Sequence, residues 1–306
     1  MKCYDAASAA FGWNRRNPQP GSMRGSDWLI DWGCATATYP TQVSPAVARL
    51  KLLADGSARV EIAAHDVGTS AYTAMAQIAA KALSIKPDQV SVAMGDTLLP
   101  PGATPAQRTA AFEKLKLGAV EEIGNLVPPT TRLKSTASLC KGSADVTGGV
   151  NAHEATNDAK TMFAFDAEFV EVRVHARTRE IRVPRIVGSF SAGRIMNPRT
   201  AHSQLMGGLI WGIGSALHEH TEIDKREARY MNDNLADYLT PVNADFAKST
   251  WSLCPRSTTR SIRRTPRASV SWPTVGTTVA IANAVFHATG RRIRALPITI
   301  DKLIQA

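Results

Sequence analysis

The chain contains 306 residues, 44% of them hydrophobic, which is enough to bury a large core and to form two domains. No apolar run approaches the roughly 18 residues of a membrane span, and the N-terminus lacks the apolar stretch of a secretory signal. The net charge of +10 is local, because residues 246–300 hold no acid but nine lysines and arginines. We therefore expect a cytoplasmic protein without membrane or nucleic-acid partners. Co-export to the periplasm beside a signal-bearing partner is the alternative.

Residues 1–96 predict a small set of short elements. A helix is expected at the start of residues 1–40, followed by a Pro- and Gly-rich connector. Residues 46–64 predict a hairpin, because Asp55-Gly56 separates two alternating apolar runs. A helix over 71–83 and a short strand over 89–94 complete this part.

Secondary structure is predicted less definitely for residues 99–160 than for the residues that follow them. Residues 99–160 show little periodicity apart from one expected helix over 106–117. A second hairpin is expected over 165–190, with Arg179 at a turn position where a positive φ would be mildly strained. Helices are expected over 199–219 and 275–288, the latter ended by Gly290 as a C-cap.

The most informative segment is Gly193–Leu217. It contains a turn at Asn197-Pro198 and then an apolar helix with four glycines, each of which would weaken an isolated helix by about 1 kcal/mol. A helix that keeps such residues usually has another chain segment or a ligand pressed against its backbone. Both readings stay open for these glycines: Gly207, Gly208, Gly212 and Gly214.

The amino-acid sequence of this segment resembles that of the molybdopterin-binding large subunit of the xanthine dehydrogenase / aldehyde oxidase family, especially its bacterial aldehyde-oxidising type. Further blocks resemble the same family in the same order, and together they cover about two thirds of the chain. These blocks are residues 11–18, 31–40, 65–80, 232–245, 280–290 and 296–299. The resemblance reaches only the C-terminal part of the family's large subunit.

The resemblance implies an α+β fold with two related subdomains of mixed sheets and helices. We expect a partial first subdomain over residues 1–100, an irregular connector over 101–160, and a second subdomain over 161–306. The second subdomain contains a disrupted segment at 249–272, rich in Ser, Thr and Arg. Resemblance is lost abruptly there and then recovers, so we hypothesise a short out-of-frame stretch.

The family hydroxylates an aldehyde or an N-heterocycle at a molybdenum centre. The resemblance therefore implies molybdenum and molybdopterin as cofactors, with the pterin in its cytosine dinucleotide form. Iron–sulfur clusters and FAD would belong to partner subunits, and a separate chain could supply the N-terminal half. This agrees with the cysteines, none of which is spaced like a metal ligand: Cys3, Cys34, Cys140 and Cys254.

The resemblance also suggests cofactor-binding residues in two segments. A turn that opens a helix offers N–H groups and hydroxyls to a phosphate, although an ordinary helix cap is an equal alternative; this turn is Gly68, Thr69 and Ser70. His65 beside it is a weak candidate. A second group lies on the glycine-rich helix, where helix packing is the favoured alternative: Gln204, Gly207 and Gly208.

The catalytic base is where the sequence departs most from the family. The family uses a glutamate, because a carboxylate can take the proton from the attacking hydroxide. That glutamate lies five residues before a glycine equivalent to Gly276, and here the position is Ser271. We therefore assign no catalytic residue. Residues 101–107 also replace the family's Gly- and Ser-rich cofactor loop.

Three readings of function follow. The first is a molybdopterin-binding fragment of an aldehyde/xanthine-type oxidoreductase, and the second is an inactive remnant of that family. The third, an unlikely one, is a basic nucleic-acid-binding protein that uses Arg256–Arg267. A metal site at His218–His220 is disfavoured, because alternate residues do not share a helix face.

Overall fold

The chain forms two compact units in a computed structural model that describes residues 2–40, 46–53, 55–96, 98–99, 143–150, 163–193, 195–246, 249–253 and 272–304. Unit 1 comprises residues 1–40 and 163–306, and unit 2 comprises residues 41–162. This grouping differs from the predicted subdomains, because residues 1–40 pair and pack with the second half of the chain. Each unit is described by itself.

Unit 1 is built on a six-stranded sheet with the order β1-β2-β8-β9-β12, in which β3 also pairs with β8. Its pairs are antiparallel except for β9 and β12, which run parallel. The strands are β1 (Arg24–Gly25), β2 (Trp28–Ala35), β3 (Thr38–Pro40), β8 (Phe163–His175), β9 (Ile181–Ser191) and β12 (Ser249–Leu253).

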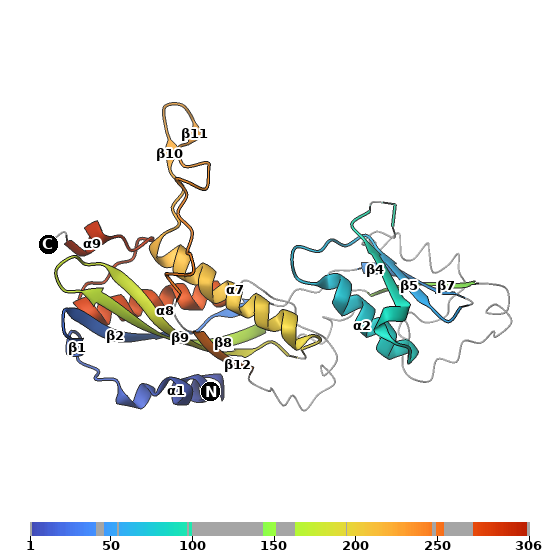
Figure 1. Cartoon of the computed structure of the whole chain (residues 1–306), viewed down its shortest axis with the longest axis horizontal. Helices are drawn as coiled ribbons and strands as arrows, with labels where there is room; N and C mark the ends of the chain where they lie inside the picture. Colours follow the sequence, from blue (N-terminus) through green and yellow to red (C-terminus); the bar gives the residue numbers. More distant parts are fainter. Residues whose placement is uncertain are drawn as a thin grey trace. The chain divides into compact units, whose positions relative to one another are not determined.

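Helices cover both faces of this sheet (Figure 1). On one face α1 packs against β8 and β9, and on the other α8 crosses β2 and β8 while α7 packs on α8. A single turn of 3-10 helix, η1, follows α1, and α9 lies near the C-terminus. The helices are α1 (Lys2–Phe11), η1 (Trp13–Arg15), α7 (Pro198–Leu217), α8 (Trp272–Thr289) and α9 (Ile300–Ile304).

Side chains of β8 point alternately to the two faces of the sheet and contribute to two hydrophobic clusters. Val170, Val172 and Val174 join the cluster under α7 and α8, whereas Ala167 and Phe169 join the smaller cluster under α1. Because successive residues of a strand point to opposite faces, both helical layers are anchored to the same strand. Within unit 1, residues 218–246 form an arm that carries the short hairpin of β10 (Ile223–Asp224) and β11 (Arg229–Tyr230).

Unit 2 contains a four-stranded sheet with the order β6-β5-β4-β7, and α2 packs against β5 and β6. The β4–β5 turn has Gly56 at φ 83°, and the Asp55 carboxylate accepts a hydrogen bond from the Ser57 N–H at 2.8 Å. The elements are β4 (Ala46–Leu53), β5 (Ala58–Ile62), α2 (Ala71–Leu83), η2 (Pro87–Gln89), β6 (Val90–Met94) and β7 (Ser143–Val150).

Most predicted elements are confirmed. The structure contains both hairpins, the helix over 71–83, the strand that follows it and the glycine-rich helix. Arg179 adopts φ 61° at its turn, and Gly290 ends α8 with φ 74°. The α+β fold class is confirmed as well.

Three predictions of local structure are wrong. Residues 28–35, expected to be connector, form β2, a strand that is largely buried. Residues 143–150, expected to be irregular, form β7, and residues 249–253 form β12 where disruption was expected. The expected helix over 106–117 and the remainder of the disrupted segment, residues 254–271, lie outside the described residues.

Candidate functional site: the α7–α8 helix pair

The glycine-rich helix α7 is fixed at its start and along one side. The Asn197 side chain caps it by accepting hydrogen bonds from the N–H groups of Arg199 and Thr200 at 3.0 and 3.3 Å. Further along, the Thr274 hydroxyl of α8 donates to the carbonyl of Gly208 at 3.2 Å, and the Thr278 hydroxyl donates to that of Gly212 at 3.2 Å. Two of the four glycines therefore bring α7 close to α8.

The other glycines differ from one another. A Cβ atom on Gly214 would collide with the Glu219 side chain and lie 2.9 Å from Pro241 Cδ, so this position is needed for packing of the arm. Gly207 is exposed, and a Cβ there would meet nothing within 4 Å. Gln204, one turn earlier, is partly buried. The open backbone at Gly207 is the part of α7 that a ligand could approach closely.

This contrast predicts opposite effects of one substitution at two positions in α7. Gly212→Ala is expected to destabilise the protein by roughly 1–3 kcal/mol through overpacking, because its Cβ would lie 2.5 Å from Thr277 Cβ. Gly207→Ala is expected to stabilise it by roughly 0.5–1 kcal/mol, since alanine favours the helix. Urea unfolding of the two variants measures both changes. Destabilisation by Gly207→Ala would show that something occupies its open side.

The second predicted group, Gly68, Thr69 and Ser70, opens α2 in unit 2. Gly68 and Ser70 both have positive φ, at 87° and 59°. The cap of this helix is Asp66, whose carboxylate accepts hydrogen bonds from the N–H groups of Thr69 at 2.8 Å, Ser70 at 3.2 Å and Ala71 at 2.8 Å. The N–H groups of Thr69, Ser70 and Ala71 are therefore not free, contrary to expectation, and Ser70 occupies the N-cap position of α2 without a side-chain cap hydrogen bond.

The environment of Asp66 favours its charged form. Although desolvation opposes the shift, hydrogen bonds from the backbone of Thr69, Ala71 and Tyr72 lower the pKa of Asp66. A negative charge at a helix N-terminus is also stabilised by the helix dipole. A phosphate at this turn would have to displace a bound carboxylate. His65, which precedes Asp66, is exposed.

Ser271, at the expected position of the catalytic glutamate, lies outside the described residues. It directly precedes Trp272, the first residue of α8. Since Thr274 is bonded to Gly208, the start of α8 lies beside the middle of α7. The predicted cofactor residues of α7 thus lie at a helix–helix junction with the first turns of α8.

A buried carboxyl group near this junction was not predicted. Glu168 on β8 is fully buried, accepts a hydrogen bond from the Thr277 hydroxyl, and lies about 3.0 Å from the position that a Cβ on Gly276 would take. Burial first, and the nearby charge of Asp166 second, raise the pKa of Glu168 well above its ordinary value. Alternation along β8 was a usable signal, because residues 166 and 168 share the face of Val170.

The histidines and cysteines do not form a metal site in the described ranges, where no three side chains of His, Cys, Asp and Glu converge. Glu219, between two histidines, instead accepts hydrogen bonds from Trp211 Nε1 at 3.3 Å and the Tyr238 hydroxyl at 3.4 Å. Cys34 is a free thiol. Of the helices in the described ranges, none combines the length and apolar character needed to cross a membrane.

Comparison with known proteins gives the class of this fold. The molybdopterin cofactor-binding domain family matches residues 6–117 and 130–247, well over half of the chain. The chain therefore belongs to this family. The matched region ends at residue 247, before the disrupted segment at residues 249–272.

Curated relatives make the relationship more specific. The chain is 32% identical to the aldehyde oxidoreductase molybdenum-binding subunit PaoC of Escherichia coli K12, over 99% of this chain and 44% of that protein. It is 26% identical to the putative xanthine dehydrogenase molybdenum-binding subunit XdhA of the same organism, over 99% and 45%. The chain thus spans less than half the length of these relatives.

Solved structures share the fold. Aldehyde oxidoreductase from Desulfovibrio gigas matches with a TM-score of 0.69 at 21% identity, covering 98% of this chain and 34% of that one. Quinoline 2-oxidoreductase from Pseudomonas putida 86 matches with a TM-score of 0.70 at 16% identity, covering 98% and 44%. At these identities the likeness concerns fold alone.

Proposed function

We propose that this chain is the cofactor-binding C-terminal part of a molybdenum hydroxylase large subunit, and that it binds molybdopterin without oxidising a substrate by itself. The observation that carries the proposal is the α7–α8 junction, where an exposed, unobstructed Gly207 lies on a helix otherwise tied to α8. Family membership and the names of the curated relatives support molybdenum and molybdopterin as the ligands.

The described residues fit this cofactor only in part. Gly207 offers open backbone for close approach of the pterin, and Gln204 beside it offers an amide that can donate and accept hydrogen bonds. The α2 turn does not fit a phosphate as it stands, because Asp66 already fills its N–H groups. We therefore place the contact on α7: Gln204 and Gly207 would bind and orient the pterin. Gly208 would hold this part of α7 in place, because its carbonyl accepts a hydrogen bond from Thr274 of α8. The molybdenum would supply the redox chemistry.

The cytosine dinucleotide form of the pterin is part of this proposal. It rests on the resemblance to bacterial aldehyde-oxidising enzymes and on the 32% identity to an aldehyde oxidoreductase subunit. A dinucleotide extends the ligand by a second phosphate and a base. It would therefore need contacts beyond Gln204 and Gly207. In unit 2, taken by itself, Gly68, Thr69 and Ser70 remain proposed cofactor-binding residues only if Asp66 is displaced.

Proton acceptance is the function that we propose this chain lacks. A serine hydroxyl at position 271 is not a base at neutral pH, and loss of a general base typically costs about 10²–10⁴ in rate. Glu168 does not replace it. Its carboxyl group is enclosed between β8 and α8, and burial together with Asp166 favours its protonated form. A protonated acid donates a hydrogen bond but cannot accept the proton.

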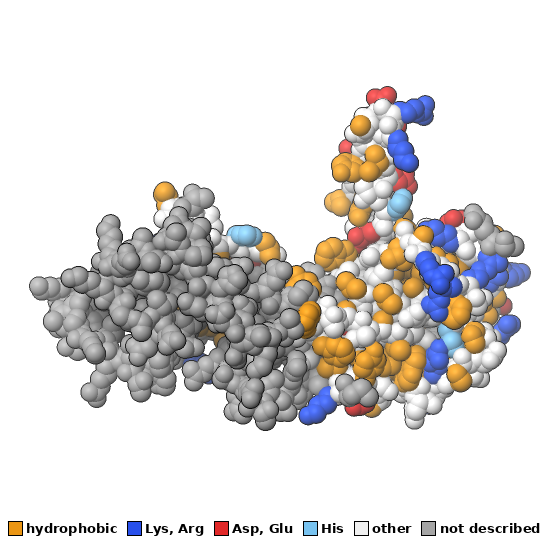
Figure 2. Space-filling view, turned by 180° about the vertical axis from the view of Figure 1, so that it is seen from behind, with side chains coloured by type: hydrophobic (Ala, Val, Ile, Leu, Met, Phe, Trp, Pro, Cys, Tyr) orange, Lys and Arg blue, Asp and Glu red, His pale blue; other side chains and the backbone are white. Residues whose placement is uncertain are grey.

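We also propose that the chain works beside other subunits that carry iron–sulfur clusters and FAD, and beside a separate chain that supplies the rest of the large subunit. The relatives are themselves named as subunits and are more than twice as long as this chain. The arm of unit 1 exposes several large apolar side chains (Figure 2), which favours a protein partner there: Ile223, Tyr230, Met231, Leu235, Leu239 and Val242.

Metal and pterin analysis of the purified chain tests the proposed ligand. After expression in a host that makes the cofactor, we expect molybdenum and pterin in equimolar amounts. Gly207→Ala should lower both at least several-fold while the folded protein becomes more stable. Ser215→Ala, two turns along the same helix, is the matched control and should retain both. Finding neither metal nor pterin in the unmodified chain would contradict the proposal, and equal contents in all three proteins would remove Gly207 from the site.

A further inference from the structure

We propose that a cavity at the edge of β2 in unit 1 binds a small aromatic carboxylate. The cavity has a volume of about 290 Å³ and opens between η1, β2 and the last turns of α8. Its lining residues, nine in all, are Trp13, Arg16, Trp32, Gly33, Cys34, Asn283, Phe286, His287 and Arg292. Asn283 lies about 17 Å along α8 from Trp272 at 1.5 Å per residue. The cavity is thus separate from the α7–α8 junction and does not depend on the proposed cofactor.

Two arginines supply the positive charge of this cavity. Arg16 stacks over Trp13 with its guanidinium carbon 4.8 Å from the ring centre, and its Nε donates to the Trp32 carbonyl at 3.0 Å. Arg292 stacks over Phe286 at 3.7 Å, and its NH1 donates to Asn283 Oδ1 at 2.7 Å. The described residues give neither guanidinium an ion-pair partner. Each retains N–H groups for an anion, and a guanidinium matches a carboxylate in shape.

A buried contact between His287 and Asp31 forms the back of the cavity. His287 is almost fully buried, with Nδ1 facing the Asp31 carboxylate and Nε2 lying 2.8 Å from the Pro18 carbonyl. Both ring nitrogens therefore face oxygen atoms of the surrounding residues. Burial raises the pKa of Asp31, and its bonds to Trp32 and His287 oppose that rise. Arg16 lies close enough to help lower the pKa of Asp31, whereas Arg292 has no ion-pair partner among the described residues.

A buried donor also lacks an acceptor. Trp32 lines the cavity, and its indole Nε1–H is buried without a hydrogen-bond partner among the described residues. Leaving such a donor unsatisfied is unfavourable. Because this nitrogen is inaccessible from the surface, Trp32 contributes its ring rather than its N–H to the wall of the cavity.

The walls define the rest of the ligand. Most of the lining is apolar, and three of the residues are aromatic: Trp13, Trp32 and Phe286. Aromatic walls favour a planar ring by stacking. The volume lies at the lower end of the range of small-molecule sites, which is suited to a single ring. One ring with one carboxylate satisfies the shape and the charge of the cavity together.

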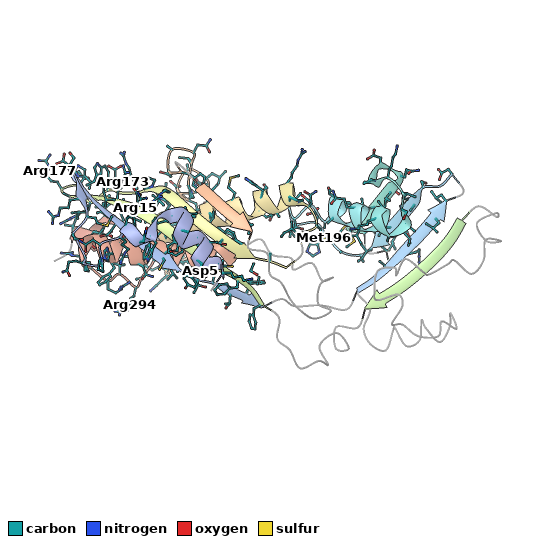
Figure 3. The ribbon with its side chains drawn as sticks, turned by 90° about the horizontal axis from the view of Figure 1, so that it is seen from below. Asp5, Arg15, Arg173, Arg177, Met196 and Arg294 are labelled. Carbon is teal, nitrogen blue, oxygen red and sulfur yellow. The ribbon has the colours of Figure 1, made fainter. Side chains whose placement is uncertain are left out.

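Ligand-observed NMR titration of the 306-residue chain with benzoate tests this inference. We expect saturable binding, at least tenfold weaker binding of benzyl alcohol, and weaker binding of inorganic phosphate. Arg292→Met should weaken benzoate binding at least tenfold. Arg294→Met is the matched control, because Arg294 follows two residues later and points away from the ribbon (Figure 3); it should bind like the unmodified chain.

Arg292 is exposed, so its substitution should leave the fold intact, which circular dichroism checks. Arg16→Met provides a second variant from the opposite wall and should also weaken binding at least tenfold. Absence of benzoate binding up to millimolar concentrations would overturn the inference. Equal loss in the Arg292 and Arg294 variants would also overturn it, as would phosphate binding as tightly as benzoate, which would indicate a general anion site.

Discussion

Replacing Gly33 with alanine is expected to destabilise unit 1 by about 3 kcal/mol or more, the upper end of the cost of overpacking a core. Gly33 lies in β2 where α8 crosses it, and a Cβ there would collide with the Ala280 carbonyl and the Ala284 nitrogen. Both are backbone atoms of a helix, so neither can move aside as a side chain would. Urea unfolding followed by circular dichroism measures the loss.

A glycine in the neighbouring strand is the control for this prediction. A Cβ on Gly25 in β1 would lie 2.9 Å from Ile30 Cδ1, the end of a flexible side chain. Gly25→Ala should therefore cost less than about 1 kcal/mol, since the isoleucine can change rotamer. If the two variants unfold at the same urea concentration, the close packing of β2 against α8 is contradicted.

The second large effect concerns Glu168. Glu168→Gln is expected to stabilise the protein at pH 8 by about 1–3 kcal/mol, because it removes an acid buried without full compensation. The raised pKa means that the folded protein holds a proton that the unfolded chain releases near pH 4.3. The free energy of unfolding of the unmodified protein therefore falls as the pH rises from about 4 through the pKa of Glu168 in the folded state. The advantage of glutamine should be small at pH 4.5 and grow towards pH 8.

Urea unfolding at several pH values tests this dependence. Glu180→Gln on the same hairpin is the control, because the Glu180 side chain is half-exposed and forms an ion pair with the exposed Arg182. Exposed ion pairs contribute about 0–1 kcal/mol, so this variant should change little at any pH. A constant difference between Glu168→Gln and the unmodified protein across this pH range would contradict a protonated, buried Glu168.

The fold could be predicted where periodicity is regular. Helix α2 and the β4–β5 hairpin follow from spacing and from Asp55-Gly56, and both were placed correctly. Strand β2 was missed because α8 covers one of its faces while Phe11 packs against Trp32 on the other, so its residues do not alternate between apolar and polar. Strand β12 was missed because it is polar in sequence and depends on parallel pairing with β9.

The candidate sites, like the fold, could be predicted only in part from the sequence. The glycines of α7 indicated close approach, but only the structure separates Gly212, which contacts α8, from Gly207, which is open. Asp66 could have been recognised as a cap, since an aspartate three residues before Thr69 suits that role. The cavity of Arg16 and Arg292 could not be predicted, because its walls come from segments more than 240 residues apart.

Aldehyde oxidation by the molybdenum-loaded chain, measured with an artificial electron acceptor, tests the central claim most directly. We propose that α7 holds the cofactor, whereas Ser271 cannot take the proton and Glu168 is enclosed with a raised pKa that favours its protonated form. We predict no oxidation above that of the cofactor-free chain. Sustained turnover in proportion to molybdenum content would contradict the account.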